Sequence, residues 1–229
     1  MIRIKICCIE SAEEASLAVR AGASALGLVS EMPSGPGVID DDRIREIAAG
    51  VPGFVVPVLL TSRTEADRIA EQAESCGVRA VQLCAPVAPS ELDRLRKMLP
   101  GVARIAVVHV SGPESALEAQ ALAGHVEGLL LDTGTRVGPE IQLGGTGRTH
   151  DWSVSRRIVE DVAVPVVLAG GLRPENVGDA IRTVRPWAVD VCGGVRSPSG
   201  SAPGGHLRLD GARLDAFVRA VREGAEGSA

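Results

Sequence analysis

Residues 164–195 read VPVVLAGGLRPENVGDAIRTVRPWAVDVCGGV and hold one full copy of the pattern that decides the fold. An apolar run ends at Gly170 and Gly171, a helix-like stretch follows, and a second apolar run ends before Gly193 and Gly194. Nearly continuous apolar runs are typical of strands that are buried on both faces of a parallel sheet. We therefore predict two parallel strands joined by a helix, with a glycine pair after each strand.

The same alternation extends over the rest of the chain. Eight short apolar runs are predicted to be strands, and eight stretches with apolar residues three and four apart are predicted to be helices. Strands that alternate with helices favour a parallel sheet, and eight such units favour a closed barrel. The predicted strands are 2–7, 25–29, 54–60, 80–83, 103–108, 128–131, 164–169 and 188–192, and the predicted helices are 12–21, 41–49, 65–75, 90–98, 114–123, 153–161, 174–183 and 211–222.

We therefore predict an α/β fold in which residues 1–229 form one (β/α)8 TIM-barrel domain, with the last few residues disordered. A chain of 229 residues, of which 45% are hydrophobic, is long enough to bury one such core. An open doubly wound sheet is the alternative. We favour the barrel because no GxGxxG fingerprint follows the first predicted strand.

Local signals predict where several helices begin and end. Ser11 and Glu14 have the spacing of a capping box, in which each side chain caps a backbone N–H at the start of a helix. Ser90 is predicted to cap an amphipathic run, and Pro174 to lie in the first turn of another helix. Gly22 is predicted to end the first helix, because glycine readily adopts the left-handed backbone found there.

Composition excludes several classes of function. The formal net charge is −5 and no long run of Lys or Arg occurs, so nucleic acid and an acidic membrane surface are not expected partners. The five cysteines are scattered without a CxxC pair, which favours neither a disulfide framework nor a metal site. The sequence shows no signal peptide and no apolar run long enough to span a membrane, so we predict a cytoplasmic location.

Glycines and polar residues follow the predicted strands, and in a barrel these positions build the active site. The glycine pairs after the seventh and eighth strands stand where barrels commonly hold phosphate. A third glycine-rich loop, LGGTGRTHDW at 143–152, contains Gly145, Thr146 and Gly147. Backbone N–H groups in such loops can surround an anion, although the same glycines also occur in plain turns. A small phosphorylated molecule is therefore the predicted ligand.

Cys7 and Asp132 end the first and sixth predicted strands, so in a closed barrel they can meet across the mouth. A thiol with a lowered pKa can accept a proton, and a partly buried carboxyl can donate one. Either residue alone could instead be a small buried side chain or a helix cap. Cys8, Cys84 and Cys192 also lie at strand ends, so a multi-cysteine metal site is a less favoured alternative, and His109 could also enter the pocket.

Several segments together resemble the phosphoribosylanthranilate isomerase family of tryptophan biosynthesis. They are KICCIESAEEASLAVRAGASALGLV at 5–29, LLLD at 129–132, LGGTGRTHDW at 143–152, PVVLAGGLRPENVGDAI at 165–181 and RPWAVDVCGGV at 185–195. The resemblance implies a TIM barrel that needs no cofactor and rearranges a phosphoribosyl amine into a 1-deoxyribulose 5-phosphate, an Amadori rearrangement. It further implies that Cys7 is the general base and Asp132 the general acid, and that the glycine loops hold the substrate phosphate.

The chain departs from that family's pattern around the mouth. Cys8 replaces the glycine of KICGI, and Gly37 stands where the family has an arginine that holds the anthranilate carboxylate. The family's QLHG appears as QLCA at 82–85, and SSGVE as CGGVR at 192–196. The other residues expected around the substrate are Lys5, Cys8, Gly37, Gln82, Cys84 and His109.

These departures leave alternatives for the function. The chain could be a paralogue that accepts a different group on the ribosyl amine, or one that catalyses another proton transfer on a phosphosugar. It could also be a barrel that binds a phosphorylated metabolite without catalysis. Arg63, Arg136 and Arg196 are the candidates for replacing the missing carboxylate contact, and the oligomeric state is left open.

Overall fold

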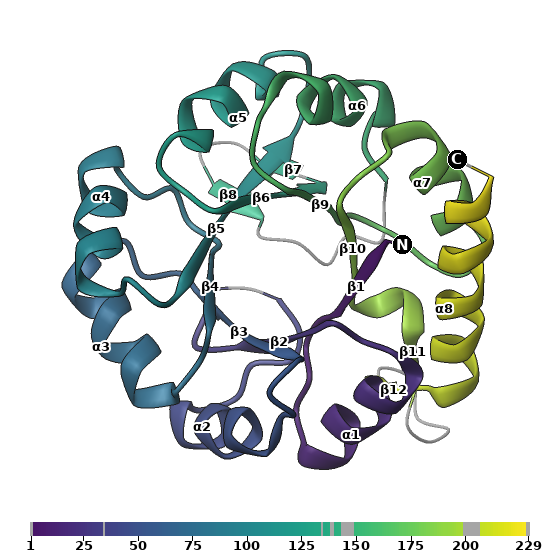
Figure 1. The fold of residues 1–229 in the computed structure, drawn as a ribbon, viewed down its shortest axis with the longest axis horizontal. Helices are drawn as coiled ribbons and strands as arrows, with labels where there is room; N and C mark the ends of the chain where they lie inside the picture. The colour runs from purple at the N-terminus through teal and green to yellow at the C-terminus, as the bar shows by residue number, and fades with distance from the viewer. Residues whose placement is uncertain are drawn as a thin grey trace.

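The computed structural model describes residues 2–33, 35–133, 135–137, 140–142, 149–198 and 207–227. Eight parallel strands close into a barrel in the order β1-β10-β9-β6-β5-β4-β3-β2, and the helices surround it (Figure 1). The predicted barrel is confirmed, and the open sheet is excluded because β1 pairs with both β2 and β10. The barrel strands are β1 (Arg3–Ile6), β2 (Ala25–Val29), β3 (Val56–Thr61), β4 (Ala80–Leu83), β5 (Ala103–Val110), β6 (Gly128–Thr133), β9 (Val166–Leu168) and β10 (Ala188–Val191).

The outer layer contains the eight helices that the apolar spacing predicts. α8, the longest, packs against both α7 and α1, so the last unit of the chain lies beside the first (Figure 1). The helices are α1 (Ala12–Ala21), α2 (Asp41–Gly50), α3 (Ala66–Cys76), α4 (Pro89–Met98), α5 (Ser115–Ala123), α6 (Trp152–Asp161), α7 (Val177–Val184) and α8 (Gly211–Glu226). In the described part of the chain, no helix is long and apolar enough to cross a bilayer.

Two short hairpins at the mouth were not predicted from the sequence. β7 (Thr135–Val137) pairs with β8 (Glu140–Gln142) after β6, and β11 (Arg196–Pro198) pairs with β12 (Leu207–Leu209) after β10. A 3-10 turn, η1 (Gly193–Val195), lies between β10 and β11. Each of these strands has three residues, which is too few to produce a recognisable alternation of apolar and polar positions.

The helix boundaries agree only in part with the local signals. Ser11 accepts the N–H of Glu14 as predicted, but the Glu14 carboxylate accepts the N–H of Glu10, one residue earlier than a capping box requires. Gly22 ends α1 in the left-handed conformation, as predicted. The prediction for Ser90 is wrong because α4 begins at Pro89 and is preceded by Ala88, which makes no side-chain cap. The prediction that Pro174 lies in the first turn of a helix is also wrong, because Pro174 lies in a turn before α7.

The apolar core has two layers. The larger cluster lies between the strands and the ring of helices and includes Leu26, Leu59 and Phe217, all fully buried. Two smaller clusters lie inside the barrel, and they include Val58 and Leu60 in one and Leu130 and Val167 in the other. Because side chains fill the barrel in this way, the space for a ligand lies above the strands, at their C-terminal ends.

Candidate active site

A cavity of about 430 Å³ opens at the C-terminal ends of the barrel strands. Its lining comes from segments far apart in the sequence, including the ends of β1, β4, β5 and β6 and the turns after β9 and β10. We call one part of the lining the thiol wall, formed by Cys7, Cys8, Gln82, Cys84 and His109, and another part the glycine wall, formed by Gly170, Gly171, Gly193, Gly194 and Arg213. Asp132 lines the cavity between them, because β6 lies between β5 and β9 in the barrel.

Cys7 is held in place immediately after β1. Its N–H donates to the carbonyl of Val191 in β10, at 2.8 Å. Gly27 in β2 leaves room for its sulfur, since a Cβ at that position would lie 2.7 Å from Cys7 Sγ. A hydrogen bond from the Cys8 thiol lowers the pKa of Cys7 and, against the effect of burial, the charge of Lys5 lowers it further. Cys7 is therefore suited to act as a thiolate base.

A buried ion pair lies beside Cys7. Lys5 Nζ and Asp190 Oδ1 are 2.9 Å apart, and both side chains are almost fully buried. Burial alone would lower the pKa of Lys5, but the charges of Asp190 and Cys7 raise it above its ordinary value. Lys5 lies behind the cavity wall, whereas Asp190 lines the cavity. Sequence reasoning missed Asp190, because an Asp inside an apolar run gives no separate signal.

Asp132 lies at the end of β6 and its carboxylate accepts the N–H of Thr133, at 2.7 Å. Burial raises the pKa of Asp132 to about 6, although the Thr133 hydrogen bond and the charge of Lys5 oppose the shift. The charge of Asp190 adds to it. A carboxyl with this pKa carries its proton over part of the near-neutral range, so it can act as a general acid.

The thiols of the cavity differ in their ionisation. Burial raises the pKa of Cys84 to about 12, and hydrogen bonds to Cys192 and Cys7 raise the pKa of Cys8 well above its ordinary value. Cys8 and Cys84 are therefore protonated near neutral pH, whereas the pKa of Cys7 is shifted in the opposite direction. His109 lines the same wall, and burial lowers its pKa, so its ring is neutral. Sequence reasoning could not distinguish among these thiols, because their environments come from different strands.

The glycine wall is built from backbone. Gly170 and Gly171 have φ values of +83° and +61°, which side chains rarely adopt. A Cβ on Gly170 would overlap Thr133 Oγ1, and one on Gly194 would overlap the carbonyl of Leu172. Gly170, Gly171, Gly193 and Gly194 line the same cavity, whereas Gly145, Thr146 and Gly147 lie outside the described residues.

Arg213 gives the glycine wall a positive charge. It lies in the first turn of α8, and its Nε donates to the carbonyl of Gly194 at 3.2 Å. Arg173 also lines the cavity, but its Nε forms an ion pair with Glu175 at 3.5 Å. Sequence reasoning missed both, since an arginine in an amphipathic helix or a polar loop resembles an ordinary surface residue.

Gly37 is sterically linked to Cys8. Its φ is +77°, and a Cβ there would lie 2.5 Å from the Cβ of Cys8. Cys8 thus occupies the space in which a side chain at position 37 would begin. Gly37 itself does not line the cavity, although its neighbours Gly35 and Pro36 do.

Two of the three candidate arginines for a carboxylate contact do not line the cavity. Arg63 is on the surface and donates to the carbonyl of Arg68, and Arg196 is buried in an ion pair with Glu14. The side chain of Arg136 lies outside the described part of the structure. Among the residues that are described, no three His, Cys, Asp or Glu side chains gather in a way that could hold a metal ion.

The closed parallel barrel, with titratable groups and glycine turns at its C-terminal mouth, defines the class of the protein as a TIM barrel with its site at the usual end. The family model "N-(5'phosphoribosyl)anthranilate (PRA) isomerase" matches residues 4–202. The chain therefore belongs to the N-(5'-phosphoribosyl)anthranilate isomerase family, as the sequence motifs predicted. It is an isomerase of a family that serves tryptophan biosynthesis.

Individual relatives agree with this assignment. The chain is 38% identical to N-(5'-phosphoribosyl)anthranilate isomerase 2 of Methanosarcina mazei over 87% of this chain and 88% of the relative. It is 37% identical to the corresponding isomerase of Haloarcula marismortui over the full length of both. The crystal structure of phosphoribosyl anthranilate isomerase from Thermotoga maritima superposes with a TM-score of 0.79 and 32% identity, covering 97% of this chain and 99% of that one.

Proposed function

We propose that this chain converts N-(5'-phosphoribosyl)anthranilate into 1-(o-carboxyphenylamino)-1-deoxyribulose 5-phosphate, with Cys7 as the general base and Asp132 as the general acid. One observation carries the assignment of residues: a thiol with a lowered pKa and a carboxyl with a raised pKa line the same cavity. A solved phosphoribosyl anthranilate isomerase bound to the reduced form of that product supports the substrate, with a TM-score of 0.77 and 30% identity to this chain.

The two groups can move protons in opposite directions. Asp132 gives its proton to the ring oxygen of the ribose as the bond from C1′ to that oxygen breaks, which leaves an iminium between C1′ and the amine. The Cys7 thiolate then removes the proton from C2′, and the electrons of that bond neutralise the iminium to form an enolamine. The enolamine tautomerises to the ketone, so substrate and product have the same atoms. Each proton transfer of this kind contributes roughly 10²- to 10⁴-fold to the rate.

Neighbouring charges assist the proposed proton transfers. The Lys5 ammonium lies close to Cys7 and favours the thiolate, while Asp190 keeps the ammonium charged. Asp190 also disfavours ionisation of Asp132, which keeps a proton on the acid. The buried pair therefore favours both active protonation states at once.

The substrate phosphate fits the glycine wall. Its backbone approaches the cavity closely, and Arg213 supplies a positive charge beside Gly194. Gly145, Thr146 and Gly147 remain predicted phosphate ligands. A cytoplasmic location and an oligomeric assembly also remain predictions for this chain.

A second candidate function, the same rearrangement with a different group on the amine, is favoured by the geometry of Gly37. The Cys8 side chain excludes a Cβ at that position, and the Arg63 and Arg196 side chains do not reach the cavity. Family membership favours either of these enzymatic functions over a non-catalytic barrel.

Turnover with purified protein tests the proposal and separates the candidates. Loss of the starting compound and formation of the deoxyribulose product would be followed with the phosphoribosyl amines of anthranilate and of aniline, which differ only in the carboxylate. The first function predicts a kcat/KM clearly higher for anthranilate, and the second predicts equal or higher values for aniline. Absence of turnover with both compounds would contradict the proposed function.

A further inference from the structure

We propose that His150 is a positioning residue, which holds the Thr133 hydroxyl and thereby fixes the direction in which the Thr133 N–H donates to the Asp132 carboxylate. Asp132 and Thr133 are the last two residues of β6, whereas His150 lies two residues before α6 and outside the cavity lining. The inference rests on the proposed role of Asp132 as the general acid. It adds a residue that acts on the acid through Thr133.

A chain of hydrogen bonds joins α6 to the Asp132 carboxylate. Ser155 Oγ, in the first turn of α6, lies 2.6 Å from His150 Nε2, and His150 Nδ1 lies 3.2 Å from Thr133 Oγ1. The N–H of Thr133 donates to Asp132 Oδ1 at 2.7 Å. Both hydroxyls can donate or accept, so either neutral tautomer of the imidazole satisfies both of its contacts. Every link from Ser155 to Asp132 is therefore a hydrogen bond or a bond within one residue.

This chain of contacts is shielded from water. Ser155 is fully buried and Thr133 is only 8% exposed. Burial lowers the pKa of His150 to about 4, although the charge of Asp151 opposes the shift, so the imidazole is uncharged near neutral pH. Buried polar atoms cannot exchange a lost protein partner for water without a cost in free energy. The contacts therefore hold the imidazole and the Thr133 hydroxyl in one arrangement.

Gly170 leaves room for the contact between His150 and Thr133. A Cβ on Gly170 would overlap Thr133 Oγ1, and it would lie 2.8 Å from Thr133 N and 3.1 Å from His150 Nδ1. Gly170 itself belongs to the glycine wall of the cavity. The imidazole, the hydroxyl and the donating N–H thus surround one point beside that wall.

The direction of the Thr133 N–H bears on how Asp132 carries its proton. A hydrogen bond to Oδ1 favours negative charge on that oxygen, so the acidic proton is carried by the other oxygen, Oδ2. The same bond lowers the pKa of Asp132 against the effect of burial. Other titratable groups also lie around Asp132, and the variants below leave them unchanged. They are Lys5, Asp190, Cys84 and His109.

A purely structural role for His150 makes the opposite prediction. If its contacts served only to join β6 to α6, their loss would admit water and lower the pKa of Asp132 toward its ordinary value of 3.8. Loss of the Thr133 N–H bond would instead raise that pKa, because the bond stabilises the ionised carboxyl. The measured quantity is therefore the titration of Asp132, followed by ¹³C NMR of protein labelled at its aspartate carboxyls. The Asp132 signal is identified by its absence in Asp132→Asn.

Two variants separate the two contacts of the imidazole. In His150→Asn the side-chain amide takes the place of Nδ1, so it keeps the contact with Thr133 and loses the one with Ser155. In His150→Gln the longer side chain places its amide near the position of Nε2, so it keeps the contact with Ser155 and loses the one with Thr133. Each variant loses one of two hydrogen bonds and is the matched control for the other.

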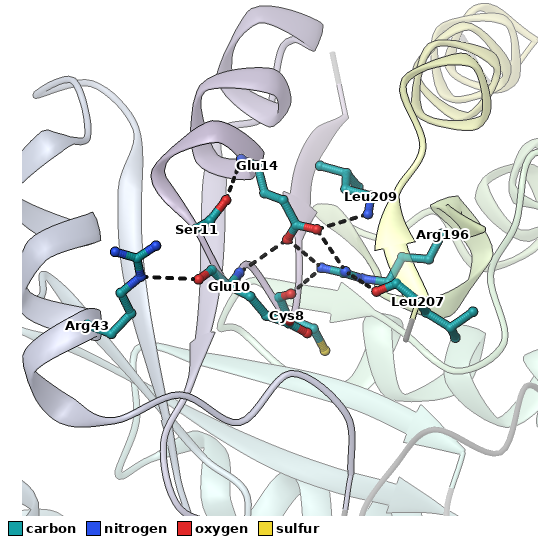
Figure 2. A network of polar contacts seen from close by, with 8 residues as sticks. All are labelled: Cys8, Glu10, Ser11, Glu14, Arg43, Arg196, Leu207 and Leu209. Carbon is teal, nitrogen blue, oxygen red and sulfur yellow. Dashed lines mark hydrogen bonds and ion pairs between the residues drawn. The ribbon is translucent and has the colours of Figure 1, made fainter. Parts of the chain in front are cut away.

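Ser11→Ala is the control for lost stability alone. The Ser11 hydroxyl accepts the N–H of Glu14 at the start of α1, at 3.2 Å (Figure 2). α1 lies across the barrel from α6 (Figure 1). Removal of this helix cap should lower the melting temperature by a few degrees and leave the titration of Asp132 unchanged.

We expect the Asp132 midpoint to stay near the native value of about 6 in His150→Asn and Ser11→Ala, and to rise by about one pH unit in His150→Gln. Thr133→Val, which removes the hydroxyl but keeps the N–H, should behave like His150→Gln and gives the answer if that variant fails to fold. A midpoint no higher than that of His150→Asn would overturn the proposal. Since the titration needs no substrate, this result is independent of whether phosphoribosylanthranilate is turned over.

Discussion

The two walls of the cavity are built on different principles. The thiol wall is made of side chains whose ionisation depends on burial and neighbouring charge, so Cys7 and Cys84 have pKa values shifted in opposite directions. The glycine wall is made mainly of backbone that lies close to the cavity, together with the Arg213 side chain. The departures at Cys8, Gly37 and Cys84 lie on or beside the thiol wall, whereas the departure at 192–196 includes Gly193 of the glycine wall. The comparison indicates that the first wall depends on which of its groups ionise, and the second on how closely its backbone approaches the cavity.

The sharpest test of the difference between the walls is removal of the proton-transfer groups. Cys7→Ala and Asp132→Asn should each lower kcat by roughly 10²- to 10⁴-fold, since each removes one general acid-base step. The measurement is steady-state turnover of phosphoribosylanthranilate. Cys76→Ala is the control, because Cys76 is buried against α2 and does not line the cavity. Activity within a few fold of native in Cys7→Ala would remove the thiol from the mechanism.

Gly27→Ala tests whether the thiol wall depends on exact placement of the base. The added methyl group would lie 2.7 Å from Cys7 Sγ and 3.1 Å from Lys5 Nζ, so both must shift. Because a misplacement of about 1 Å can cost on the order of 100-fold, kcat should fall by about that factor. Gly53→Ala, where no atom lies within 4 Å of the added Cβ, is the matched control. Equal kcat values for the two variants would show that the sulfur position is not critical.

Arg213→Met probes the glycine wall. Loss of one charge-assisted hydrogen bond should raise KM roughly tenfold with little change in kcat, because the phosphate is bound equally in substrate and transition state. Arg219→Met, on the exposed side of the same helix, is the control. The prediction is contradicted if kcat falls and KM does not change.

The smallest expected effect concerns stability. The pKa of Asp132 is raised from 3.8 to about 6 in the folded protein, so the fold favours the protonated carboxyl. Stability therefore falls as pH rises from about 4 to 6, and the loss persists above pH 6. Asp132→Asn cannot ionise, so at pH 7.5 it should melt a few degrees above the native protein, where 1 kcal/mol corresponds to about 2–4 °C. Near pH 4 the variant and the native protein should melt at the same temperature. Thermal melts at both pH values decide this, and a lower melting temperature at pH 7.5 would contradict it.

The fold was predictable because its signal is local and repeated. Each of the eight strands and helices carries its own apolar periodicity, so errors at single boundaries, such as Ser90 and Pro174, do not change the architecture. The position of Cys7, Asp132 and the glycine pairs around one cavity was also predictable, since strands of a barrel end at the same face. Asp190 and Arg213 were not, because an Asp in an apolar run and an arginine in a helix acquire their roles only from neighbours distant in sequence.

The sequence by itself determined the barrel, the end at which the site lies and the family to which the chain belongs. Tertiary structure decided which thiol has a lowered pKa, why Gly37 has no room for a side chain, and that Arg196 is buried in an ion pair with Glu14. The physical reason is that periodicity and glycine act through the local backbone, whereas pKa values, steric exclusion and buried ion pairs depend on groups that meet only when the barrel closes.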